Sequence, residues 1–116
     1  MDFIENISFK VVDDTRVLIN ETKTYTDSTS SDFITSTYDL VDGTTDYPVE
    51  LGRVGKIKYL FIDSSSPISI KLNSTSNTAI PVKFIVLSTV DATSLYITNS
   101  SGSTTNIKLS LVGIPT

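Results

Sequence analysis

The chain alternates apolar and polar residues over much of its length. Ile68, Ile70 and Leu72 alternate with polar residues, and the stretches 95–98 and 107–112 repeat the pattern. A period of two places every second side chain on the same face of a strand, so these stretches predict strands with one buried face. No window has a convincing i, i+3, i+4, i+7 apolar spacing, although a short helical turn near 27–38 is left open.

Turn-forming residues separate the alternating stretches. Clusters of Asp, Asn, Ser, Gly and Pro lie between them, as in Asp42-Gly43. Short strands divided by polar turns are typical of antiparallel sandwiches and barrels. We therefore expect an all-β fold, an antiparallel two-sheet sandwich of jelly-roll-like form. The expected strands or extended segments are 3–12, 16–25, 33–41, 47–51, 56–63, 68–72, 80–90, 95–98 and 107–112.

One β domain is expected over 1–116, because this is the length of a single domain. Within it, 1–50 is expected to form less regular strands and loops, and 51–116 the regular sandwich. The segment 56–63 is apolar on both faces, which is typical of a strand covered on both sides. We expect Lys56, Lys58, Lys71 and Lys108 to face outward. The expected core comprises Ile57, Tyr59, Phe61, Ile68, Ile70, Leu72, Phe84, Val86, Leu95, Ile97, Ile107, Leu109 and Leu111.

The composition favours strands and excludes several kinds of chemistry. Val, Ile and Thr make up 40 of the 116 residues, and these stiff side chains suit a pleated surface. The chain has no Cys and no His, which excludes disulfides, thiolate or imidazole metal sites and a Ser-His-Asp triad. No sequence pattern identifies one carboxyl group as a general acid and a second as its general base. We expect neither an enzyme nor a cofactor.

One acidic segment is a candidate calcium site. Asp39, Asp42 and Asp46 lie with a glycine within eight residues, and Ca²⁺ prefers several oxygen ligands. The spacing is not that of an EF-hand loop. The alternative interpretation, a solvated Asp-Gly turn, is favoured.

The charge argues against two classes of partner. A net charge of −4 disfavours binding to nucleic acid or to an anionic membrane. Arg53, Lys56 and Lys58 lie close together beside Tyr59, yet an outward pair of lysines that discourages sheet aggregation is the favoured interpretation. The N-terminus is acidic and alternating, unlike a signal peptide.

A pattern of strands and turns carries a resemblance. The segments concerned are VELGRVGKIKYLFID from Val49, SPISIKLN from Ser66, IPVKFIVLSTV from Ile80 and SLYITNSSGSTTNIKLSLVG from Ser94. Together they resemble small β-rich proteins of tailed-bacteriophage virions. The resemblance covers a little over half the chain and implies no catalytic residues. It implies a structural role in the virion for a protein that is made in the host cytoplasm.

Within that resemblance, a capsid auxiliary or decoration protein is the leading interpretation. The alternatives are a tail, adaptor or fibre component and, from a different class, a carbohydrate-binding sandwich that uses exposed tyrosines. The expected partners are other virion proteins, a major capsid protein or tail proteins, and further copies of the chain in an oligomer or symmetric array. We expect partner contacts in 1–50 from Phe3, Ile4, Phe33, Ile34 and Tyr38.

Overall fold

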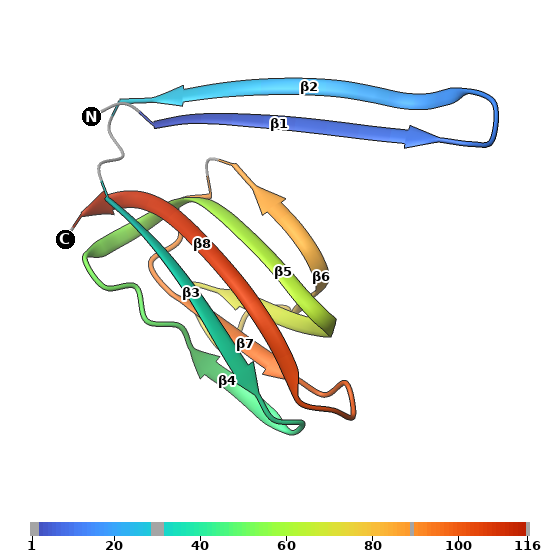
Figure 1. Ribbon diagram of the computed structural model, residues 1–116. Coiled ribbons are helices and arrows are strands. Elements are labelled where there is room, and N and C mark those ends of the chain that lie inside the picture. Colours follow the sequence, from blue (N-terminus) through green and yellow to red (C-terminus); the bar gives the residue numbers. More distant parts are fainter. Residues whose placement is uncertain (1–2, 29–31, 89, 116) are drawn as a thin grey trace. The chain divides into compact units, whose positions relative to one another are not determined.

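Two compact β units make up the chain. The computed structural model describes residues 3–28, 32–88 and 90–115, and it divides into unit 1, residues 1–31, and unit 2, residues 32–116 (Figure 1). Strands hold about 72% of the described residues, which contain no helix. The expected all-β fold with antiparallel sheets is confirmed.

Unit 1 is a long β-hairpin of β1 (Phe3–Val12) and β2 (Val17–Asp27). The two strands pair antiparallel from Phe3 opposite Asp27 to Val12 opposite Val17, with an irregularity at Val11 and Val12. The Asp13 carboxylate closes the turn, because its Oδ1 accepts the backbone N–H groups of Thr15 and Arg16 at 3.1 and 3.2 Å. Such an Asx-type turn is a local preference of Asp, so the sequence itself determines where this hairpin reverses.

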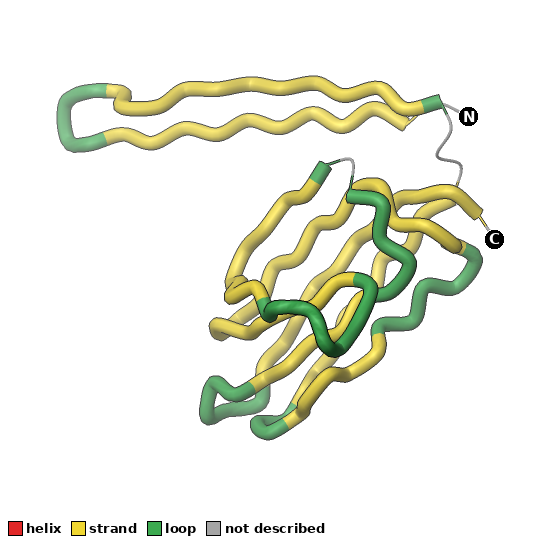
Figure 2. The backbone as a smooth tube through the Cα atoms, turned by 180° about the vertical axis from the view of Figure 1, so that it is seen from behind, coloured by secondary structure: helices red, strands yellow, loops and turns green. Residues whose placement is uncertain are grey.

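Unit 2 is a curled six-stranded sheet (Figure 2). Its strand order is β3-β8-β5-β7-β4, and β6 pairs with β5 beside this path. The curl brings the strands around one core, as in a β-sandwich. The strands are β3 (Asp32–Leu40), β4 (Thr44–Pro48), β5 (Val54–Leu72), β6 (Ile80–Leu87), β7 (Leu95–Asn99) and β8 (Thr105–Pro115).

β3 and β4 belong to the same unit as the later strands. One domain over 1–116, with its regular part at 51–116, is expected from the sequence, and this remains a prediction. Residues 29–31, within the polar segment expected as a loop, lie outside the described residues. No helical turn forms in 32–38, because β3 occupies that segment and pairs with β8.

The long strand β5 links the two halves of the curled sheet. Leu60 pairs with Leu87 on one edge and Leu111 on the other, whereas Ile70 pairs with Ile80 and Ile97. β8 therefore lines the first half of β5 and β7 the second half. The expected break between strands 56–63 and 68–72 is wrong, because β5 continues through an irregularity between Asp63 and Ile68.

Bulges in β5 change which residues face the core. Ile57 pairs with Gly113 but Tyr59 with Val112, so β5 has an extra residue there. Each extra residue moves the following side chains to the opposite face. The core face therefore continues through Leu60 and Ile62, which are 1% and 0% exposed, rather than through Tyr59 and Phe61 as expected.

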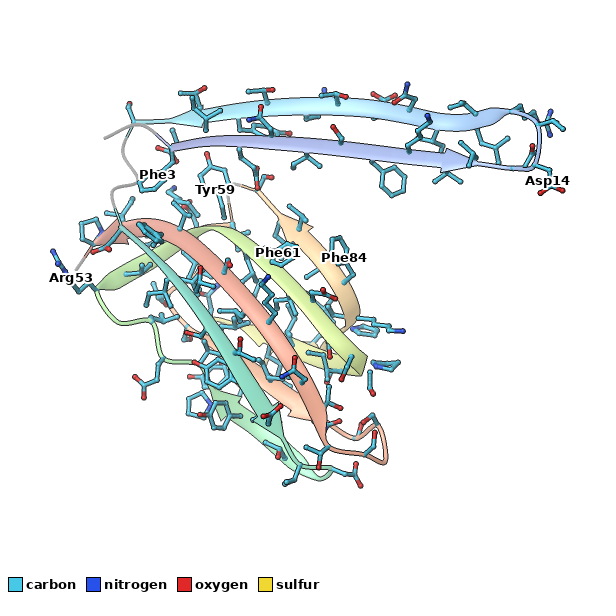
Figure 3. The ribbon with its side chains drawn as sticks, in the orientation of Figure 1. Phe3, Asp14, Arg53, Tyr59, Phe61 and Phe84 are labelled. Atoms are coloured by element: carbon cyan, nitrogen blue, oxygen red, sulfur yellow. The ribbon has the colours of Figure 1, made fainter. Side chains whose placement is uncertain are left out.

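Most of the expected core is buried. Tyr59 is buried on the other face of β5, and Phe61, Leu72 and Val86 are half-buried. Phe84 was expected in the core and is 63% exposed, because it lies opposite Asp63 on the outer side of the sheet and packs edge-on against Phe61 (Figure 3). The central core of unit 2 comprises Leu40, Val49, Val54, Ile57, Leu60, Ile62, Ile68, Ile70, Val82, Ala92, Leu95, Ile97, Ile107, Leu109 and Leu111.

Candidate interaction surface

The β1–β2 hairpin has one apolar and one polar face. Residues opposite each other in an antiparallel pair point to the same side, and here Val11 lies opposite Ile19, Phe9 opposite Glu21 and Ile7 opposite Lys23. The face that carries most of the apolar side chains, called the apolar face below, has Phe3, Ile7, Phe9, Val11, Ile19 and Tyr25 together with the charged Glu5, Glu21, Lys23 and Asp27. The other face is mainly hydroxyl and amide groups, including Asn6, Ser8, Asn20, Thr22 and Thr24.

Large apolar side chains of this hairpin are exposed. On the apolar face, Phe9 is 55% exposed and Ile19 43% exposed. Near the turn, Val12, Val17 and Leu18 are each more than half exposed. Scattered exposed apolar residues are common, but a group on one element marks an interaction surface.

Among the described strands, β2 is the most exposed. Every residue from Val17 to Thr26 is exposed, and β2 pairs with β1 alone among the described strands. An antiparallel strand with one unpaired edge presents a row of backbone donors and acceptors. The hairpin therefore offers two kinds of contact, an apolar face and a strand edge.

The expected partner-contact residues occupy different surroundings. Ile4 and Phe33 are 63% and 62% exposed, and Phe3 is half-buried. Ile34 and Tyr38 are half-buried against the core of unit 2. The Tyr38 hydroxyl also accepts the Glu50 N–H at 3.3 Å.

Sequence reasoning did not select Phe9, Ile19 or Tyr25 as contact residues. Part of the signal was present, because apolar residues alternate from Ile7 to Val11, whereas 17–19 is a continuous apolar run followed by polar residues and Tyr25. Which strand lies opposite β1, and in which register, was needed to see that these three side chains share a face.

The structure does not gather the three carboxylates proposed as a calcium site. Asp39 accepts from the Asn106 amide at 2.9 Å, and Asp42 accepts the Gly102 N–H at 2.9 Å. Asp46 forms an ion pair with Lys71 at 3.1 Å. Within the described ranges, no three acidic residues come together as a group that could hold a metal ion.

The basic residues near β5 form ion pairs with acidic ones. Lys58 binds the Asp91 carboxylate, and the Arg53 Nε lies 3.4 Å from an oxygen of Asp32. The hydrogen bond from Lys58 lowers the pKa of Asp91 below its ordinary value of 3.8, against a smaller opposing effect of burial. Lys56 is exposed, and the bulge after Ile57 interrupts the alternation that would otherwise place Lys56 and Lys58 on the same face.

The tyrosines do not form a platform for stacking on sugar rings. Tyr25 is 38% exposed, while Tyr38, Tyr47 and Tyr96 are half-buried and Tyr59 is buried. The rings of Tyr38 and Tyr47 meet edge-on at 66° rather than lying coplanar.

Comparisons with known proteins assign no function, so a functional argument rests on the arrangement of the residues. No family model matches the sequence, and no curated protein or solved structure matches it either. Among the residues that the structure describes, there is no helix that is long and apolar enough to cross a membrane.

Proposed function

We propose that the protein is a non-enzymatic structural protein that acts through protein–protein interfaces. The exposed apolar side chains on the β1–β2 hairpin carry this proposal. An isolated two-stranded hairpin is only marginally stable in water, and a third strand or a packed face stabilises it. A partner that covers the apolar face would stabilise the hairpin and remove its apolar area from water at about 25 cal/mol per Å².

The resemblance of residues 49–114 to phage virion proteins supports the proposal that these interfaces form within a virion. The proposed role is a capsid auxiliary or decoration protein of a tailed bacteriophage, in which many weak contacts add up over a symmetric shell. A tail, adaptor or fibre component would use the same hairpin against a different partner.

Incorporation into particles tests the proposal. Phe9→Asn combined with Ile19→Thr removes two exposed apolar side chains from the hairpin. We expect the variant to fold and to be lost from purified particles, as measured by quantitative mass spectrometry of particle proteins. Val41→Thr, at a 62% exposed position in the turn between β3 and β4, is the control and should leave incorporation unchanged.

Two outcomes would contradict the proposal. One is normal incorporation of the Phe9 and Ile19 double variant. The other is hydrolysis of a glycan or a peptide by the purified full-length chain.

A further inference from the structure

One edge of β2 pairs with no other described strand, and the sequence along it is self-complementary. We propose that two copies of this chain pair through β2, antiparallel about a two-fold axis at Thr22, and form a four-stranded sheet in the order β1-β2-β2-β1. This inference rests on the proposed role of the hairpin as an interaction element and names one partner for it, a second copy.

Charge complementarity selects the register. With Thr22 opposite Thr22 of the second copy, Glu21 of each copy lies opposite Lys23 of the other. Opposite charges directly across an antiparallel pair are stabilising, and like charges are destabilising. The two-fold axis forms this pair twice.

The same register also matches the side chains on either side of the charge pairs. Ile19 lies opposite Tyr25 of the second copy on the apolar face, and Asn20 lies opposite Thr24 on the polar face. All 11 residues of β2 lie opposite a residue of the second copy. The match covers residues 19–25; beyond them Leu18 lies opposite Thr26 and Val17 opposite Asp27.

Neighbouring registers are unfavourable. Moving one copy by two residues places Glu21 opposite Glu21, or Lys23 opposite Lys23 in the other direction. Moving it by one residue places the apolar face of one hairpin beside the polar face of the other. The charges on β2 thus favour one pairing.

The edge of β1 lacks this property. Its only basic residue, Lys10, is on the polar face, whereas Glu5 is on the apolar face. No register that keeps the apolar faces together brings these two charges opposite each other. The proposal therefore assigns the contact to β2.

The pairing is compatible with the proposed function. A four-stranded sheet with one apolar side meets the strand number that independent stability requires. Because the contact uses the strand edge, the apolar face with Phe9 and Ile19 stays available to another partner. The two kinds of contact can be tested separately.

Charge exchange in the full-length chain is the first test. Wild-type protein should show a concentration-dependent monomer–dimer equilibrium in sedimentation velocity. Glu21→Lys and Lys23→Glu should each weaken dimerisation about tenfold, since both charge pairs become repulsive. An equimolar mixture of these two variants should associate again, because every pair across the mixed dimer is then of opposite charge.

Lys10→Glu is the matched control for the charge of the hairpin. It makes the same charge change as Lys23→Glu, but on the polar face of β1, and should leave dimerisation unchanged. Circular dichroism of every variant checks that the strands are retained.

A cysteine probe tests the position of the two-fold axis. The chain has no Cys, so Thr22→Cys introduces a single thiol. Residues directly opposite in an antiparallel pair have Cα atoms about 4.5–5.5 Å apart, within the range that a disulfide spans. Mild oxidation should therefore cross-link Thr22→Cys efficiently. Thr24→Cys should cross-link poorly, because the two thiols lie four residues apart along the strands, roughly 13 Å.

The possible results distinguish a failure of the β2 pairing from a failure of the proposed function. A wild-type monomer at all concentrations, a dimer unaffected by the charge variants, or equal cross-linking at positions 22 and 24 would overturn the β2 pairing. Particle incorporation that depends on Phe9 and Ile19 would still support the proposed function in each of those cases. Rescue by mixing, together with selective cross-linking at position 22, supports the pairing.

Discussion

Asn99 shows how one buried side chain connects two turns. Its Nδ2 donates to the backbone oxygens of Leu40 and Ser103 at 2.8 and 2.9 Å, and its Oδ1 accepts the Ser101 N–H at 3.1 Å. The residue is 0% exposed. Because each polar atom has a partner, the end of β3 is tied to the loop between β7 and β8.

Removing this amide should be costly. Asn99→Ala removes the side-chain donor to the Leu40 oxygen, whereas the Ser103 oxygen still accepts from the hydroxyls of Ser101 and Thr105. An unsatisfied buried group costs about 1–3 kcal/mol. We expect the free energy of unfolding to fall by about 1–3 kcal/mol, measured by urea denaturation. Asn106→Ala removes one exposed hydrogen bond to Asp39 and should change stability by less than about 1 kcal/mol. Equal effects of the two substitutions would contradict this account.

Leu109 tests the assignment of the core face. It is 0% exposed on β8, between Ile107 and Leu111. Leu109→Ala should lower the free energy of unfolding by roughly 2–5 kcal/mol, through lost apolar burial and a residual cavity. Lys108→Ala, at the exposed neighbouring position, is the control. A loss below about 1 kcal/mol for Leu109→Ala in a denaturant series would show that the register is wrong.

The Asp91–Lys58 ion pair predicts a pH dependence of stability. Its hydrogen bond depresses the pKa of Asp91 in the folded state below 3.8. The ionised carboxylate therefore stabilises the fold above that pH, and the stabilisation is lost as the pH falls through the lowered pKa. Asp91→Asn should reduce the urea midpoint at neutral pH, with a difference from wild type that shrinks as the pH falls from about 4 to 2.

A second substitution isolates the pair. In a Lys58→Met background, Asp91→Asn should have little effect at neutral pH, because the partner cation is absent. An undiminished effect in that background would attribute the stabilisation to another contact of Asp91.

At the scale of elements, the pairing of β5 with β8 depends on close backbone approach. A Cβ at Gly113 would overlap the carbonyl oxygen of Lys56 and lie 2.8 Å from a methyl group of Val54. Gly113 lies opposite Ile57, at the bulge that turns Leu60 toward the core. A glycine at this point allows the two strands to remain paired across the irregularity.

Gly113→Ala should therefore disturb the ladder. The added methyl group meets backbone rather than a movable side-chain end, so β8 or β5 has to shift. We expect a loss of at least about 2 kcal/mol in the free energy of unfolding. Ser110→Ala on the same strand is the control, and near-equal midpoints would show that the bulge tolerates a side chain.

At the scale of the whole molecule, the two units differ in what stabilises them. The central core consists of residues from 40 to 111, all in unit 2. The hairpin of unit 1 has a complete ladder but exposed apolar residues on its strands and near its turn. The described core of unit 2 therefore contains no residue of the hairpin.

Deleting residues 1–28 should leave unit 2 folded. We expect the shortened chain to unfold in one cooperative transition in urea and to keep a dispersed amide NMR spectrum. Loss of cooperative unfolding would show that the core of unit 2 needs the hairpin. The shortened chain should also lose the dimerisation assigned to β2.

Local sequence patterns are sufficient to define several of the strands. Alternation placed β1, β7 and β8 closely, and the buried faces at 95–97 and 107–111 are as expected. Asp and Gly residues placed the turns, because their side-chain hydrogen bonds and backbone freedom act over a few residues. The absence of Cys and His set limits on chemistry that no fold could change.

Tertiary structure alone decided which face each residue presents and which strands belong together. A bulge reverses the side-chain alternation, so the burial of Leu60 rather than Phe61 followed from pairing with a strand about 50 residues away. Phe84 is apolar and was expected inside, yet its position opposite Asp63 directs it outward. The shared apolar face of Phe9, Ile19 and Tyr25 likewise depended on the register of β1 against β2. Register is a property of two strands, and the pattern within one strand does not contain it.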